Sequence, residues 1–139
     1  MKKNHSVIFI IILILVLAFL AFFFARNYTK VSHDEITISK NDNNSTVNIE
    51  NGNILNVTLT NPGDGGYQFD EPAYDTNLLK LLSHEHTNAK DAAYMVGNFG
   101  TDTWKFEAIS SGQTELIFNI YRACNNEKAT YFEATININ

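Results

Sequence analysis

Apolar and polar residues alternate with a period of two along most of the chain beyond residue 34, which is typical of β-strands that bury one face. Six runs carry the pattern: 36–39, 47–50, 55–60, 104–108, 116–120 and 132–138. Within each run the apolar residues would share one face of the strand. The pattern predicts an all-β fold, most simply an immunoglobulin-like, antiparallel β-sandwich of two layers.

Two connections add detail to this expectation. Asn51-Gly52 lies between the second and third runs, and an Asn-Gly pair favours a tight hairpin. Residues 72–94 are harder to interpret, because the leucines at 78, 79, 81 and 82 fit either a helical turn or a buried strand. In an all-β context we expect a strand over 79–85.

The N-terminal part of the chain is different, since residues 7–25 are uninterrupted apolar and follow Lys2 and Lys3. As a helix, about 19 residues at about 1.5 Å each would span close to the ~30 Å hydrocarbon layer, which predicts an N-terminal transmembrane or signal helix. The run is longer than a cleavable signal requires, and Phe22–Phe24 break the small-x-small pattern before Ala25. An uncleaved signal anchor is therefore favoured over a cleaved signal peptide.

The predicted organisation is a cytoplasmic segment, a signal anchor or signal peptide, a stem and one β-sandwich domain, over residues 1–6, 7–25, 26–33 and 34–139. The domain would lie outside the cytoplasm on a membrane anchor, or be secreted if the anchor is cleaved. The chain has 139 residues and a formal net charge of −5 without a basic cluster, which argues against nucleic acid as a partner. We expect a monomeric domain.

Candidates for catalysis or metal binding are few. His84 and His86 would share one face of a strand, but no third ligand is evident, so we expect solvated histidines and no metal site. His33 is interpreted in the same way. The only cysteine, Cys124, cannot form an intramolecular disulfide or a CxxC motif, and it lacks the surroundings of a catalytic thiol. The carboxylates are scattered along predicted solvent faces, so the sequence indicates no catalytic residue, no cofactor and no enzyme.

Three loop segments, at 61–67, 96–102 and 121–126, are rich in glycine or aromatic residues. The first reads Asn-Pro-Gly-Asp-Gly-Gly-Tyr: its proline stiffens the backbone, and its glycines permit a tight, protruding turn. In the second, glycines bracket Phe99. Loops of this kind at one end of a sandwich are typical of a binding module.

In order and content these loops resemble those of the chagasin-like inhibitors of papain-family cysteine peptidases. The family's first loop reads Asn-Pro-Thr-Thr-Gly-Tyr or Phe, and residues 61–67 keep both ends with one extra residue. Its second reads Gly-x-Gly-Gly, where this chain has Gly-Asn-Phe-Gly at 97–100. Its third reads Tyr-x-Arg-Pro-Trp, similar to Tyr-Arg-Ala-Cys at 121–124, although the proline and tryptophan are replaced.

The resemblance implies a reversible, competitive inhibitor whose partner is a papain-family cysteine peptidase. In the family the first loop enters the active-site cleft over the catalytic cysteine, and the other two clamp its walls. The candidate protease-binding residues are Asn61, Pro62, Gly63, Asp64, Gly65, Gly66, Tyr67, Gly97, Asn98, Phe99, Gly100, Arg122, Ala123 and Cys124. The alternative is a membrane-anchored, immunoglobulin-like binding module without inhibitory activity.

Overall fold

The computed structural model describes residues 3–27, 33–89, 99–122, 124 and 127–139. These fall into two compact units, Met1–Ser32 and His33–Asn139. The first contains a single helix, α1 (Lys3–Asn27). Among the residues described, no helix combines the length and the apolar character needed to cross a membrane. This finding overturns the predicted membrane anchor over 7–25, while the alternative of a cleaved export signal stays a prediction.

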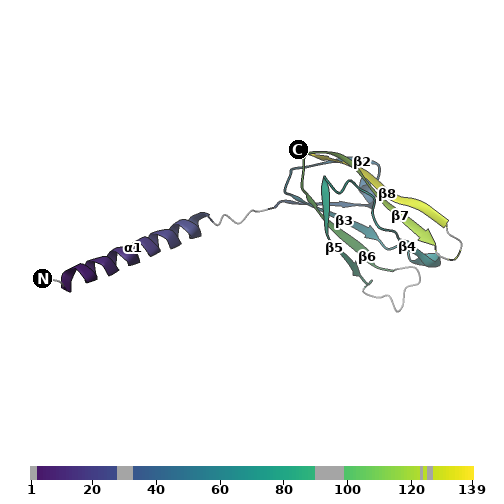
Figure 1. Ribbon diagram of the computed structural model, residues 1–139. Helices are drawn as coiled ribbons and strands as arrows, with labels where there is room; N and C mark the ends of the chain where they lie inside the picture. Colours follow the sequence, from purple (N-terminus) through teal and green to yellow (C-terminus); the bar gives the residue numbers. More distant parts are fainter. Residues whose placement is uncertain (1–2, 28–32, 90–98, 123, 125–126) are drawn as a thin grey trace. The chain divides into compact units, whose positions relative to one another are not determined.

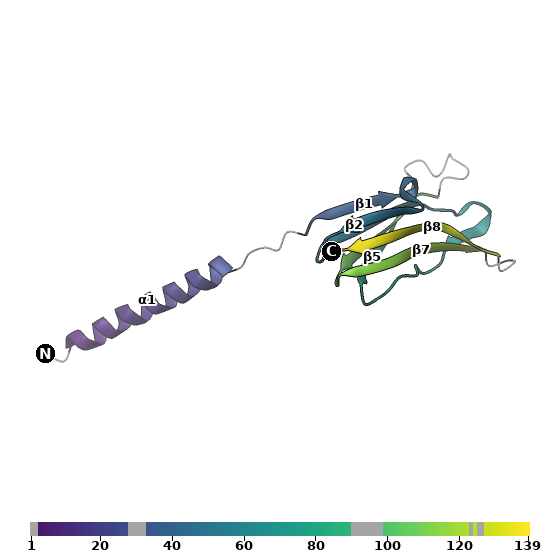
Figure 2. The ribbon, with the colours of Figure 1, turned by 90° about the horizontal axis from the view of Figure 1, so that it is seen from above.

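The second unit is a sandwich of two four-stranded β-sheets, which confirms the predicted architecture (Figures 1 and 2). One sheet has the order β1-β3-β6-β5 and the other the order β2-β8-β7-β4. The strands are β1 (Glu35–Ser39), β2 (Ser45–Ile49), β3 (Ile54–Thr60), β4 (Tyr67–Phe69), β5 (Leu79–Thr87), β6 (Thr101–Ala108), β7 (Gly112–Arg122) and β8 (Glu127–Ile138). Two short 3₁₀ turns, η1 (Lys40–Asp42) and η2 (Asp64–Gly66), lie in the connections.

The core lies between the sheets and is formed by the apolar positions of the alternating runs. Its largest fully buried side chains are aromatic: Trp104 and Phe106 from β6, Phe118 from β7 and Phe132 from β8. The rings of Trp104 and Phe118 meet across the sheets at 4.6 Å between centroids. Each such ring buries on the order of 150–250 Å² of surface, so these contacts between the sheets dominate the stability of the sandwich.

The sheets are not purely antiparallel as predicted, because β1 pairs with β3 in parallel and β2 pairs with β8 in parallel. The first four strands alternate between the two sheets. A chain that crosses to the other sheet and back has reversed its direction twice, so β3 runs beside β1 in the same direction.

The predicted Asn51-Gly52 hairpin is wrong for the same reason: β2 and β3 lie in different sheets, and the turn connects them. Its backbone groups bond to the end of β6 instead of closing a hairpin. Gly52 N–H donates to the Ala108 carbonyl at 2.7 Å, and Ala108 N–H donates to the Asn53 carbonyl at 3.0 Å.

The strand predicted over 79–85 is confirmed and extends to Thr87 as β5. The pairing registers bring several strand ends together: Thr60 and Thr87 both lie opposite Thr101, and Tyr67 and Glu127 both lie opposite Arg122. We call this the loop end of the sandwich. It lies away from the C terminus of the chain, and it carries the first and third of the predicted loops and the described flanks of the second (Figures 1 and 2).

Candidate functional site

The first loop, residues 61–67, is fixed at its base by Asn61. The backbone N–H of Asn61 donates to the carbonyl of Gly100 at 2.9 Å, which joins the end of β3 to the start of β6. The side-chain oxygen of Asn61 accepts the N–H of Gly63 at 2.9 Å, closing a turn around Pro62. Gly66 N–H then donates to the Gly63 carbonyl at 3.2 Å. Hydrogen bonds at Asn61 and at Gly66 thus hold both ends of the turn.

The second loop contacts the first through Phe99. A Cβ atom built on Gly63 would lie 2.7 Å from Cγ of the Phe99 ring, so the ring occupies the space that a side chain at 63 would need. Phe99 remains 41% exposed. The glycine at 63 therefore allows an aromatic side chain to pack directly on the backbone of the first loop while its other face meets solvent.

The third loop contacts the first through Arg122, the last residue of β7. Its Nε–H donates to the carbonyl of Gly65 at 2.5 Å, and its guanidinium lies over the Tyr67 ring at 5.0 Å from the centroid. Gly65 has φ of 69°, and a Cβ there would lie 2.7 Å from Nη2 of Arg122. A residue with a side chain would therefore be strained at 65 and would displace the guanidinium.

Tyr67 supports this contact from below. It is half-buried, and its pKa is raised above the ordinary value of 10.0, first by a hydrogen bond to Glu127 and then by desolvation. The neutral phenol is therefore the stable form, with the guanidinium of Arg122 against its ring.

The structure brings together most of the residues that the sequence nominated. Asn61, Pro62, Gly63, Asp64, Gly65, Gly66 and Tyr67 form the first loop; Phe99, Gly100, Arg122 and Cys124 lie at the same end of the sandwich. The thiol of Cys124 is free and exposed. Three nominated residues, Gly97, Asn98 and Ala123, lie outside the described residues.

Behind the first loop the structure corrects one prediction, on the carboxylates, and adds to another, on the histidines. Asp102 is buried, with 4% of the residue exposed, although we expected the carboxylates on solvent faces. His84 and His86 are exposed, as predicted for solvated histidines, and they also bind Asp102 at 2.8 and 3.2 Å. The signal was present in the sequence, since Asp102 lies two residues before Trp104 and the period of two places both on the inner face. Among the described residues, no group of three His, Cys, Asp or Glu could hold a metal ion.

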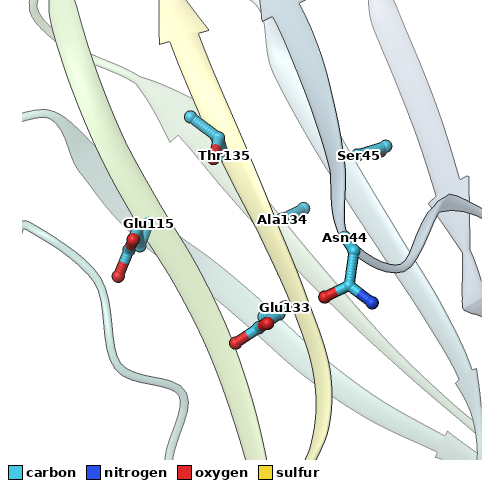
Figure 3. Close-up of a pocket in the computed structure, with 6 residues that line it drawn as sticks. All are labelled: Asn44, Ser45, Glu115, Glu133, Ala134 and Thr135. Atoms are coloured by element: carbon cyan, nitrogen blue, oxygen red, sulfur yellow. The ribbon is translucent and has the colours of Figure 1, made fainter.

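A pocket of about 180 Å³ lies elsewhere, at the edge between β2 and β8 (Figure 3). Figure 3 shows Glu115 and Glu133 on neighbouring strands β7 and β8, with Asn44 at the approach to β2. The remaining lining residues are Ser45, Ala134 and Thr135. None of the six belongs to the three loops, so this pocket is separate from the candidate site.

Residues 48–138 match the model of the chagasin family of peptidase inhibitors, family I42, and this match covers more than half of the chain. The chain belongs to this family. The predicted resemblance to the chagasin-like inhibitors is therefore confirmed, and so is the prediction that the chain belongs to a family of protease inhibitors and not of enzymes. No curated protein matches the chain at a significant level.

Solved structures that share the fold include a cysteine protease inhibitor. The inhibitor EhICP2 from Entamoeba histolytica is 15% identical with a TM-score of 0.65, covering 76% of this chain and 96% of its own. Amebosin is 18% identical with a TM-score of 0.60, covering 76% and 99%. A third, PbICP-C, solved in complex with falcipain-2, is 13% identical with a TM-score of 0.49, covering 78% and 92%. At these identities the likeness to the first two shows the fold of the β-sandwich.

Proposed function

We propose that this chagasin-family chain is a reversible, competitive inhibitor of papain-type cysteine peptidases. The first loop occupies the active-site cleft of the peptidase, and Phe99 and Arg122 contact the walls on either side. The observation that carries this proposal is that both side chains pack on the backbone of the first loop, at Gly63 and Gly65 respectively. The described parts of the three loops therefore present one continuous surface instead of three independent contacts.

The physical chemistry of this surface suits an inhibitor. A loop held by its own hydrogen bonds loses little conformational entropy when it binds, and this is the main cost that a flexible peptide would meet. A closed turn also keeps its peptide bonds out of the extended conformation that a peptidase requires for attack, so the loop occupies the cleft without being cleaved. Phe99 and Arg122 are of the residue types that contribute most to protein interfaces.

The test is a titration of the purified chain against papain and a cathepsin-L-like peptidase with a fluorogenic peptide substrate. We expect the apparent KM of the peptidase to rise with inhibitor concentration while kcat stays constant, and activity to return on dilution. Two variants, Pro62→Ala and Gly65→Trp, should weaken inhibition, the second more strongly because it displaces Arg122. If micromolar wild-type protein leaves hydrolysis unchanged, the alternative of a non-inhibitory binding module takes its place.

A further inference from the structure

Asp102 is a buried carboxylate that the proposed contact with a peptidase does not use. Its Oδ2 accepts the side-chain amide N–H of Asn61 at 2.6 Å and lies 3.2 Å from Nδ1 of His86. Its Oδ1 lies 2.8 Å from Nε2 of His84. A buried charge is costly unless it is paired and hydrogen-bonded, so these three partners are what allow Asp102 to lie on the inner face of β6.

The bond from Asn61 to Asp102 determines which way the Asn61 amide points. The amide nitrogen faces a carboxylate, which can only accept, while the amide oxygen faces the N–H of Gly63, which can only donate. A flip of the amide would break both bonds at once. Asp102 therefore determines whether Asn61 can close the turn of the first loop.

The two histidines connect Asp102 to the core. The His84 ring stacks on the buried indole of Trp104, with 4.4 Å between centroids and 11° between planes. The other ring nitrogen of His86 lies 3.2 Å from Oδ1 of Asn88. Both rings come from β5 and lie on the same face of the sheet as Trp104 and Asp102, because His84 lies opposite Trp104 and His86 opposite Asp102 in the register. A continuous path of contacts thus runs from Trp104 through His84 and Asp102 to Asn61.

We propose that Asp102 is a positioning residue for inhibition: its carboxylate, held by His84 and His86, orients Asn61 and so maintains the binding shape of the first loop. This inference rests on the proposed inhibitory function. Asp102 itself need not touch the peptidase. Asp102→Asn keeps the shape of the side chain but removes the negative charge and one acceptor oxygen, so the hydrogen bond from Asn61 is no longer charge-assisted and is weakened.

The first test is a double-mutant cycle on inhibition of papain, with each variant confirmed as folded by circular dichroism. Asp102→Asn should raise Ki about tenfold, a loss in the range expected for a hydrogen bond to a charged group. In the background of Asn61→Ala the same change should alter Ki less than twofold, because Asp102 then has no amide to orient. A tenfold effect in both backgrounds would mean a general structural role and overturn the proposal.

The matched control is Thr103→Val, next to Asp102 on β6. Thr103 Oγ1 makes a cross-strand contact with Thr58 Oγ1 at 3.4 Å, away from the first loop. Its Ki should stay within twofold of the wild-type value. If Asp102→Asn does not fold, His86→Ala serves in its place, since it removes the partner that shares Oδ2 with Asn61. We expect a threefold to tenfold increase in Ki, and an unchanged Ki would contradict the proposal.

The second test needs no peptidase, so it separates this inference from the proposed function. Hydrogen exchange of the Gly63 amide, followed by NMR on the free protein, reports the bond to Asn61 directly. Asp102→Asn should accelerate this exchange about tenfold, while Thr103→Val leaves it unchanged. Faster exchange in a protein that inhibits no peptidase would refute the inhibitory function and keep the positioning role. Unchanged exchange would overturn the positioning role whatever the inhibition.

Discussion

Replacing Arg122 with alanine tests the contact between the first and third loops most directly. The change removes the hydrogen bond to the Gly65 carbonyl, 2.5 Å long, and the guanidinium that lies 5.0 Å from the Tyr67 ring centroid. A hydrogen bond from a charged donor contributes roughly 1.5–3 kcal/mol, and an exposed cation–π pair about 0.5–1 kcal/mol. Because solvent screens exposed charges, we discount the combined range of about 2–4 kcal/mol to about 1.5 kcal/mol. This corresponds to a Ki about tenfold higher.

The assay is the competitive Ki against papain, measured for Arg122→Ala, Arg122→Lys and a charge-matched control. Lysine keeps the charge but lacks the planar guanidinium, so Arg122→Lys should recover only part of the affinity. Lys80→Ala is the control: it also removes one exposed positive charge, but Lys80 lies at the start of β5, paired with Glu107 at 3.7 Å, far along the strand from the loop end. Its Ki should stay within twofold of the wild-type value.

The reasoning is refuted if Arg122→Ala is folded and inhibits within twofold of the wild-type protein. In that case the contact between Arg122 and Gly65 would contribute nothing to binding. An equal loss of inhibition in Lys80→Ala would also contradict the reasoning. It would indicate that long-range attraction between charges, and not direct contact by Arg122, contributes the affinity. Repeating both measurements at high salt separates these cases, since salt screens the long-range term.

Two further predictions concern stability and ionisation at the same end of the sandwich. Gly100 and Gly66 both have positive φ, of 84° and 82°. A Cβ atom on Gly100 would lie 2.1 Å from the Thr87 carbonyl oxygen, whereas a Cβ atom on Gly66 would have no described neighbour within 4 Å. In urea unfolding, Gly100→Ala should therefore cost more than about 3 kcal/mol and Gly66→Ala about 1 kcal/mol, and equal losses would contradict the close approach. The hydrogen bond to Glu127 raises the pKa of Tyr67 in the folded protein above 10.0, the ordinary value. The folding stability that this contributes should therefore be lost as pH rises above 10.0 and through the pKa of the folded state. Glu127→Gln should lower the pKa of Tyr67 in an NMR titration and leave that of Tyr131, which burial raises, unchanged.

The strands were predictable from the sequence because alternation reports which face of a strand is buried. Leu55, Val57 and Leu59, for example, alternate along β3 and are all fully buried. Alternation does not report which strand lies beside which. The short strands β1 and β2 therefore looked like members of an antiparallel sheet, although each lies at the edge of a different sheet and pairs in parallel.

The candidate site, too, was predictable only in part from the sequence. Pro62, Phe99 and Arg122 could be nominated from local composition and from the resemblance, and the structure brings them to one end. The support behind them could not be assigned, because it depends on the register between β5 and β6. That register brings His86 opposite Asp102, which then meets Asn61 at the end of β3. Such contacts join residues separated by 16 to 41 positions, and periodicity within one strand carries no information about them.

The glycines of the first loop have two different uses in the structure. The sequence indicated only that these glycines permit a tight, protruding turn. At Gly63 and Gly65, however, the space is taken by Phe99 and Arg122, so these two glycines serve contacts within the inhibitor. Only Gly66 leaves open space above the loop among the described atoms. Close approach to the catalytic residues of a peptidase would therefore fall to Gly66. The third loop, which lacks the proline and tryptophan of the family's pattern, would act chiefly by holding Gly65 in place through Arg122.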